Sequence, residues 1–409
     1  MAYELRLSAA EARSAADIQT ALNLLSQRGG GRLTLPAMDL TLDRGLELGS
    51  GVELVGQGEQ TILRKGPGRA YPLTGYCNYG MCDVPLADAT GLAVGMTVSV
   101  LDNARGGFAS TFARITWIDA GWVGLDRGLE SDYHADQSPR LTTAYPLIFA
   151  HRARGIAIRK LRLVGNRAAS QTPMDSCRGS AIYFGQCVDC EVSNVLESDY
   201  DGDGIGFQMC RNVRLFNTRC DGNAGNGFHP GAGSTQVLFD QCAADSNVHS
   251  GFFFCVRANH VTVRDCCFSH NDIGVSVGAR DCHNELLLCT LRHNRGPGLY
   301  VRPDRNPVEV YALLVDGCTF DTNGADRRAP AIDLNGDAHD LIVTRCTLRG
   351  QLGIQSSNGV HGLWLEANDE SGCDVPRQLA QASLASVRPE FAAGFSTAIE
   401  SDWRHLPTI

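Results

Sequence analysis

Three aspartates alternate in the segment SDYDGDG, at Asp199, Asp201 and Asp203, and two histidines follow at His229 and His249. Carboxylates bind divalent cations and exchange protons, and histidine is the side chain whose ordinary pKa lies nearest neutral pH. A convergent set of these groups could take a proton from a substrate carbon, give one to a leaving oxygen, or hold a metal ion. The sequence separates them, so the fold must bring them together.

The spacing Asp199-x-Asp201-x-Asp203-Gly204 resembles the first half of a calcium-binding loop. Cys210 stands where such a loop places its bidentate acid, which excludes an EF-hand. Two alternatives remain. Asp199, Asp201 and Asp203 form an acidic Ca²⁺ site, or the chain uses no cofactor and the aspartates cap backbone amides of a polar turn.

Glycines mark a repeat in the second half of the chain: Gly204, Gly227, Gly251, Gly274 and Gly298 are 23, 24, 23 and 24 residues apart. Apolar residues stand one and three positions after most of them, a pattern typical of a strand with one buried face. A period of this length with Gly/Asn turns indicates a β-helix. We therefore predict an all-β fold, a right-handed parallel β-helix with coils from about 155 to about 359.

Two further residue types recur with the same period. Cysteines stand at Cys242, Cys266, Cys289, Cys318 and Cys346, and asparagines at Asn223, Asn247, Asn271 and Asn294. We expect the cysteines to fill the core, and the pair Cys187-x-x-Cys190 to do the same rather than bind zinc. The asparagines should stack at one turn, each amide bonding the backbone of the next coil.

The regions outside the repeat complete a division into four segments. Residues 1–69 contain SAADIQTALNLLSQ, a predicted amphipathic helix that caps the open end of the solenoid, and the first coils. Residues 70–148 break the rhythm and predict a small β-rich insertion, packed on the helix side or over a groove. Residues 149–367 form the coil core. Residues 368–409 lose the period and should form a capping tail.

The register also predicts which side chains face outward on one sheet. These are His229, Phe253 and Tyr300 two positions after a glycine, Gln208 and Arg302 four after, and Arg257 and Arg280 six after. Stacked strands lie about 4.8 Å apart, so these side chains should form one patch. Asp203, His229 and His249 would occupy three successive coils at its edge. Exposed aromatic rings there would suit a sugar, and the arginines would suit its carboxylates.

The composition restricts the partners. A formal net charge of −9 argues against nucleic acid and against a membrane surface. No apolar run approaches the roughly 18 residues of a membrane span. The N-terminus lacks the pattern of a signal peptide, which predicts a cytoplasmic protein unless a leader has been trimmed. The 16 cysteines then indicate reduced thiols, with Cys77 and Cys82 the best disulfide candidates if the protein is exported.

The predicted capping helix with GGGRLTLPA, followed by the repeats from 155 to 359, resembles the pectate-lyase-like superfamily of right-handed parallel β-helix proteins. The resemblance covers most of the chain. It implies a carbohydrate-active protein with an oligo- or polysaccharide as its partner. The superfamily includes polysaccharide lyases, polygalacturonase-like hydrolases, uronate epimerases, fructotransferases and phage tailspikes, and fold alone does not choose among them.

We expect an enzyme that cleaves glycosidic bonds in an acidic glycan, with a lyase favoured. In a lyase, His229 would be the base near C5, Tyr300 or His249 the proton donor, and Ca²⁺ or the pair Arg257/Arg280 the group that neutralises the uronate.

Other functions compete with the lyase, and the resemblance alone also implies a uronate epimerase or a glycan transferase on the same fold. In a hydrolase, Asp201 and Asp203 would be acid and base with His229 in support, or Asp175 would supply the second carboxyl. In a non-catalytic glycan-binding or tailspike-like protein, the chain would form a homo-oligomer, with a trimer implied by the tailspike resemblance.

Overall fold

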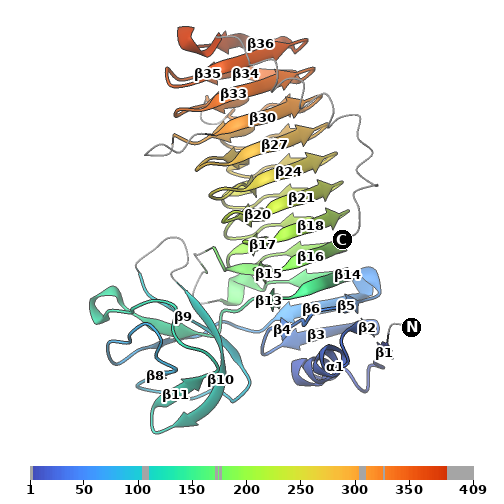
Figure 1. Cartoon of the computed structure of the whole chain (residues 1–409), viewed down its shortest axis with the longest axis vertical. Helices are drawn as coiled ribbons and strands as arrows, with labels where there is room; N and C mark the ends of the chain where they lie inside the picture. Colours follow the sequence, from blue (N-terminus) through green and yellow to red (C-terminus); the bar gives the residue numbers. More distant parts are fainter. Residues whose placement is uncertain are drawn as a thin grey trace.

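The chain folds into a parallel β-helix with a small antiparallel domain beside its N-terminal coils (Figure 1). This is a computed structural model, which describes residues 3–103, 110–170, 174, 177–303, 310–325 and 328–384. Asp175 lies outside these residues. Among the helices of the described ranges, none has the length and apolar character that crossing a membrane requires.

Each coil contributes a strand to each of three stacks, and neighbours in a stack pair in parallel. The first stack carries the functional side chains discussed below. It contains β4 (Leu46–Glu47), β13 (Ile148–His151), β15 (Ser180–Gly185), β17 (Asp203–Gln208), β20 (Phe228–Gly231), β23 (Ser250–Phe253), β26 (Ile273–Val277), β29 (Leu299–Val301), β32 (Ile332–Leu334) and the end of β34 (Thr347–Ser356).

The other two stacks close the coils. The second contains β1 (Glu4–Arg6), β2 (Gly31–Thr34), β5 (Val52–Val55), the starts of β14 (Arg154–Val164) and β16 (Val188–Ser198), β18 (Arg211–Phe216), β21 (Thr235–Asp240), β24 (Asn259–Arg264), β27 (Cys282–Leu287), β30 (Tyr311–Asp316), β33 (His339–Thr344) and β35 (His361–Glu366). The third contains β3 (Met38–Leu42), β6 (Thr61–Lys65), the ends of β14 and β16, β19 (Arg219–Asp221), β22 (Ala243–Asp245), β25 (Cys267–Ser269), β28 (Thr290–Arg292), β31 (Thr319–Asp321), the start of β34, and β36 (Asp369–Gln378).

The repeating glycines and asparagines hold the coils in register, as predicted. A Cβ atom at Gly227 would lie 2.7 Å from the carbonyl oxygen of Gly251, so only glycine permits this approach between coils. The Asn247 side-chain oxygen accepts the backbone N–H of Asn223 at 3.0 Å, and Asn271 accepts that of Asn247 at 2.9 Å. The recurring cysteines are buried in the core, and all 16 thiols are free, including those of the loop pair considered for a disulfide.

Helix α1 (Ala15–Gln27) caps the first coil. The Ser14 hydroxyl accepts the backbone N–H of Asp17 at 3.1 Å, which satisfies a free donor at the helix start. The apolar stripe of the helix, including Ile18, Leu22 and Leu25, is fully buried against the coils. The helix therefore covers the end of the core that the first coil would expose to water.

The segment that breaks the rhythm is a separate six-stranded antiparallel sheet with its own apolar core (Figure 1). Its strands are β7 (Ala70–Pro72), β8 (Asp83–Pro85), β9 (Thr97–Leu101), β10 (Thr111–Asp119), β11 (Trp122–Leu125) and β12 (Arg140–Thr142). We call it the insertion. It leaves the solenoid after β6 and returns to it at β13, where β4 and β13 pair directly.

The coils continue further than the sequence predicts. We expected the period to be lost after residue 367, but β36 pairs in parallel with β34 as far as Gln378. Backbone pairing extends the stack there without the apolar repeat, because β36 is mostly exposed and needs few core side chains. A short 3₁₀ turn, Gln381–Leu384, follows.

Candidate functional site

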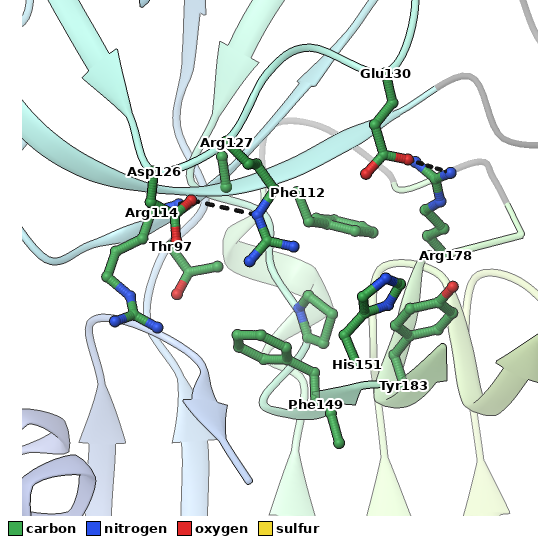
Figure 2. A pocket seen from close by; sticks show the side chains of 13 residues that line it. Thr97, Phe112, Arg114, Asp126, Arg127, Glu130, Phe149, His151, Arg178 and Tyr183 are labelled. Atoms are coloured by element: carbon green, nitrogen blue, oxygen red, sulfur yellow. Dashed lines mark hydrogen bonds and ion pairs between the residues drawn. The ribbon is translucent and has the colours of Figure 1, made fainter. Parts of the chain in front are cut away.

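A cleft lies between the insertion and the first stack (Figure 2). Arg114, Asp126 and Arg127 reach into it from the insertion, whereas Phe149, His151 and Tyr183 reach into it from β13 and β15. Thr97, Phe112, Glu130 and Arg178 also line it. The cleft therefore combines aromatic surface, positive charge and titratable groups, which is the composition expected of a ligand site.

His151 and Tyr183 are the two side chains of the cleft that could accept and donate a proton. They flank Gly185, where a Cβ atom would lie 2.5 Å from Nδ1 of His151 and 3.2 Å from the hydroxyl of Tyr183. Desolvation and the charges of Arg127 and Arg152 lower the pKa of His151, whereas burial raises that of Tyr183. At neutral pH the imidazole is therefore a base and the phenol an acid.

Three arginines line the cleft, and each has a carboxylate partner. Arg114 pairs with Glu47, and Arg178 pairs with Glu130. Arg127 Nε lies 3.3 Å from a carboxylate oxygen of Asp126 (Figure 2). Only two of these carboxylates, Asp126 and Glu130, line the cleft, so its wall carries more positive than negative groups. Guanidinium groups held in this way suit the carboxylates of an incoming ligand.

The structure brings Asp203 and His229 together, as the register predicts. A carboxylate oxygen of Asp203 lies 2.6 Å from Nδ1 of His229, and the two residues are 6% and 5% exposed. Burial opposes the charged imidazole, but the Asp203 carboxylate outweighs it and raises the pKa of His229 to about 10. A raised pKa makes His229 a less effective base at neutral pH, and its role as the base of a lyase stays a prediction.

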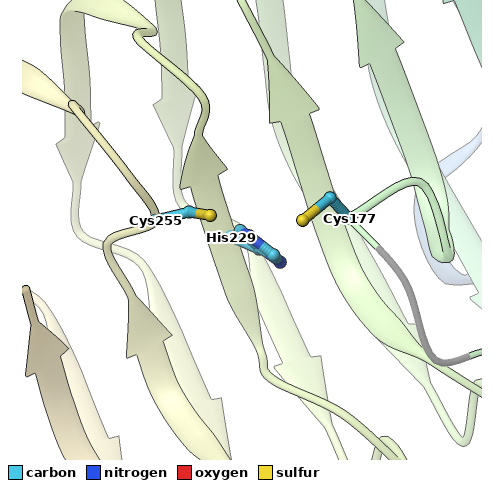
Figure 3. Close-up of side chains that lie close together, drawn as sticks. All are labelled: Cys177, His229 and Cys255. Atoms are coloured by element: carbon cyan, nitrogen blue, oxygen red, sulfur yellow. The ribbon is translucent and has the colours of Figure 1, made fainter. Parts of the chain in front are cut away.

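Two cysteines complete the surroundings of His229. The sulfur atoms of Cys177 and Cys255 point toward its imidazole from different sides (Figure 3). One ligand atom from each of the three residues lies within 4.8 Å of the others. A hydrogen bond from the Cys177 thiol, together with His229, lowers the pKa of Cys255 against the effect of burial. Within the described residues, this group is the His/Cys/Asp/Glu cluster that could hold a metal ion.

Gln208 and Phe253 contact the same histidine, and Arg302 packs on the ring of Phe253. Gln208 is fully buried, with its amide nitrogen 3.4 Å from Nε2 of His229. Phe253 packs edge-on against the imidazole at 5.1 Å between ring centroids, and the Arg302 guanidinium lies 4.4 Å from the centre of the Phe253 ring. Phe253 and Tyr300 are half-buried, so the exposed aromatic patch that we expected is absent from this face of the described chain.

The three aspartates have separate environments. Asp199 is exposed, Asp201 forms a buried ion pair with Lys65 at 3.0 Å, and Asp203 contacts His229. Two of the three carboxylates therefore already have a partner: the Lys65 ammonium for Asp201 and the His229 imidazole for Asp203. Calcium binding by the three together stays a prediction, to be tested by chelation.

The remaining candidates do not join this group. His249 is exposed in the turn before β23, and Arg257 and Arg280 are exposed in turns where both adopt positive φ. Tyr300 lies on β29, three strands beyond His229 along the first stack. The register placed these residues on the correct side of the solenoid, but it did not make them converge.

Sequence reasoning missed the cleft and Cys177, and it placed Cys255 in the outward column without giving it a role. Tyr183 stands in the same outward column as Gly206 and His229, so extending the register by one coil would have found it. Cys177 precedes β15 outside the repeat, and the insertion has no repeat at all. Contacts made by these segments could not be read from a period.

Residues 153–291 match the family model described as the right handed beta helix region. No curated protein matches the chain by sequence. The A-module of mannuronan C-5 epimerase AlgE4 from Azotobacter vinelandii has a similar structure, with a TM-score of 0.55 and 14% identity over 91% of this chain and 95% of that one. The catalytic domain of a GH87 α-1,3-glucanase, in complex with tetrasaccharides, is also similar, with a TM-score of 0.52 and 13% identity. The match covers 90% of this chain and 58% of that one. At these identities the likeness shows the fold.

Proposed function

We propose that this chain, which has the right-handed parallel β-helix fold of the pectate-lyase-like superfamily, binds an acidic glycan in the cleft and cleaves it by β-elimination. The observation that carries the proposal is the pair His151 and Tyr183 under an arginine-rich wall. Structurally similar proteins include one named as an epimerase of mannuronan and one bound to tetrasaccharides, which supports a saccharide as the ligand.

The proposed reaction begins at C5 of a uronate. Arg127 or Arg178 binds the substrate carboxylate and stabilises the negative charge that develops when the C5 proton leaves. The neutral imidazole of His151 takes that proton. The C4–O bond then breaks as the C4–C5 double bond forms, and the Tyr183 hydroxyl protonates the leaving oxygen. Protons and electrons balance without an added reactant.

Epimerisation is the second candidate, because it begins with the same loss of the C5 proton. It differs only in the return of a proton to the opposite face of C5, and Tyr183 would supply that proton to a sugar bound between the two side chains. The two carboxyls that hydrolysis requires are less suitable, since Asp126 and Glu130 are both paired with arginines.

The test incubates the protein with polymannuronate, polyguluronate, polygalacturonate and a neutral glucan. Ultraviolet absorbance of an unsaturated product would support β-elimination. Deuterium uptake at C5 without cleavage would support epimerisation. New reducing ends without that absorbance would show hydrolysis, and binding without any reaction would show a glycan-binding protein. Hydrolysis, or binding without any reaction, would overturn the proposal.

Matched variants then test the residues. His151→Gln and Tyr183→Phe should each lower kcat by about 100-fold or more, the usual contribution of a positioned acid or base. His249→Gln and Tyr300→Phe serve as controls, because they lie outside the cleft and should keep full activity. If the His249 and Tyr300 variants lost activity and the His151 and Tyr183 variants kept it, the reaction would take place at the patch predicted from the register.

A further inference from the structure

We propose that Cys177, His229 and Cys255 bind a single zinc ion, which fastens the segment before β15 to the first stack. Thiolate and imidazole are the ligands that zinc prefers in proteins. With Zn–S bonds of about 2.3 Å and Zn–N bonds of about 2.0 Å, tetrahedral ligand atoms lie roughly 3.5 to 4 Å apart. The three ligand atoms already lie within 4.8 Å of one another, so small side-chain rotations complete the site.

Asp203 supplies the support that a zinc-bound histidine normally has. Its carboxylate accepts the Nδ1 proton of His229 at 2.6 Å, which leaves Nε2 as the metal-binding atom. Asp203 is itself held by Asn226, whose backbone N–H and side-chain amide donate to the other carboxylate oxygen at 2.6 and 3.0 Å. The imidazole is therefore fixed in orientation before any ion arrives.

Gln208 is the candidate for a fourth ligand. Its side chain is fully buried, and its oxygen accepts no hydrogen bond from the described residues. Gly231 makes the approach possible, because a Cβ atom there would lie 2.6 Å from Cβ of Cys255 and 2.7 Å from that oxygen. A buried acceptor without a partner is costly, and a cation would satisfy it. Water is the alternative fourth ligand.

The position of the site gives the ion a structural role. Cys177 directly precedes Arg178, which pairs with Glu130 of the insertion in the cleft. His229 lies on β20, and Cys255 follows β23. Zinc would therefore join the segment that carries Arg178 to two later coils. Zinc binding depends only on these ligands, so a cleft without any activity would leave the metal site intact.

The first experiment measures metal in the full chain. Protein stripped with a chelator is dialysed against Zn²⁺, and bound zinc is measured by mass spectrometry. About one zinc per chain is expected for the wild type, and much less for Cys177→Ser and Cys255→Ser. Cys267→Ser is the matched control, since Cys267 is half-buried on β25 and belongs to no ligand group of the described residues. Asp203→Asn should weaken binding by about 10- to 100-fold.

Two measurements on the wild type remain decisive if a variant fails to fold. Co²⁺ in place of zinc should give the thiolate-to-metal charge-transfer absorption of two cysteine ligands. Zinc should also protect Cys177 and Cys255, but not Cys267, from alkylation. The proposal is overturned if neither ion binds, if both serine variants keep full stoichiometry, or if peptide mapping finds a Cys177–Cys255 disulfide in the freshly purified protein.

Discussion

The Nζ atom of Lys65 lies 3.0 Å from a carboxylate oxygen of Asp201, and both side chains are buried. Lys65 ends β6, the last strand before the insertion, whereas Asp201 lies in the turn between β16 and β17. Burial raises the pKa of Asp201, and the nearby Lys65 ammonium acts against that shift. The pair therefore links coils on either side of the insertion through two buried charges of opposite sign.

Removing one partner of this pair should be costly. Lys65→Met leaves Asp201 buried without its counter-charge and should lower the free energy of unfolding by about 3 to 5 kcal/mol. Urea unfolding followed by circular dichroism measures the change. Lys160→Met is the natural control, because Lys160 is the only other lysine and is exposed. Replacing both partners by apolar residues should recover much of the loss, and equal midpoints for Lys65→Met and wild type would contradict the prediction.

Glu197 should make stability depend on pH. Burial raises its pKa well above the ordinary 4.5, while Asn223 donates to its carboxyl at 2.8 Å. The folded protein therefore keeps a proton that the unfolded chain releases, and stability falls as the pH rises above about 4.5.

Glu197→Gln removes that penalty and should raise the melting temperature at neutral pH. Its advantage over wild type should shrink toward zero as the pH falls below about 4. The exposed Glu59→Gln serves as control. A Glu197→Gln advantage that does not change with pH would show that the carboxyl titrates normally.

The activity of the cleft should persist into mild acid. The pKa of His151 is lowered by desolvation, by Arg127 and by Arg152, so the imidazole stays unprotonated below the ordinary 6.5. The acid limb of the kcat/KM profile should therefore have its midpoint below that value. Arg127→Gln should move the midpoint upward. A midpoint that stays fixed in Arg127→Gln would assign the limb to another group.

The asparagine ladder should contribute strongly to stability. Asn247 is fully buried, accepts the N–H of Asn223, and donates to the carbonyl oxygen of Cys220 at 3.1 Å. Asn247→Ala leaves these groups unpaired and should cost about 1 to 3 kcal/mol for each lost partner. The exposed Asn23→Ala on α1 should change little. Denaturant midpoints of both variants would decide whether the ladder is as strong as its geometry indicates.

The period of the sequence was sufficient to predict the solenoid. Gly204 to Gly298 fixed the register, and that register correctly brought Asp203 next to His229. It could not reveal that both residues are buried, because Cys177 reaches them from a segment outside the repeat. Neither could it reveal the cleft, since His151 and Tyr183 gain their partners from the insertion, whose strands follow a different pairing pattern.

The direct pairing of β4 with β13 has a consequence for how this protein can change. The stack continues across the point where the insertion leaves and returns. The insertion is therefore connected to the solenoid by two chain segments, after β6 and before β13, and none of its strands belongs to a coil. One wall of the cleft, with Arg114 and Arg127, can therefore be exchanged as a module while the wall with His151 and Tyr183 stays in place. Grafting another insertion between residues 66 and 147 would alter ligand selectivity without rebuilding the proton-transfer pair.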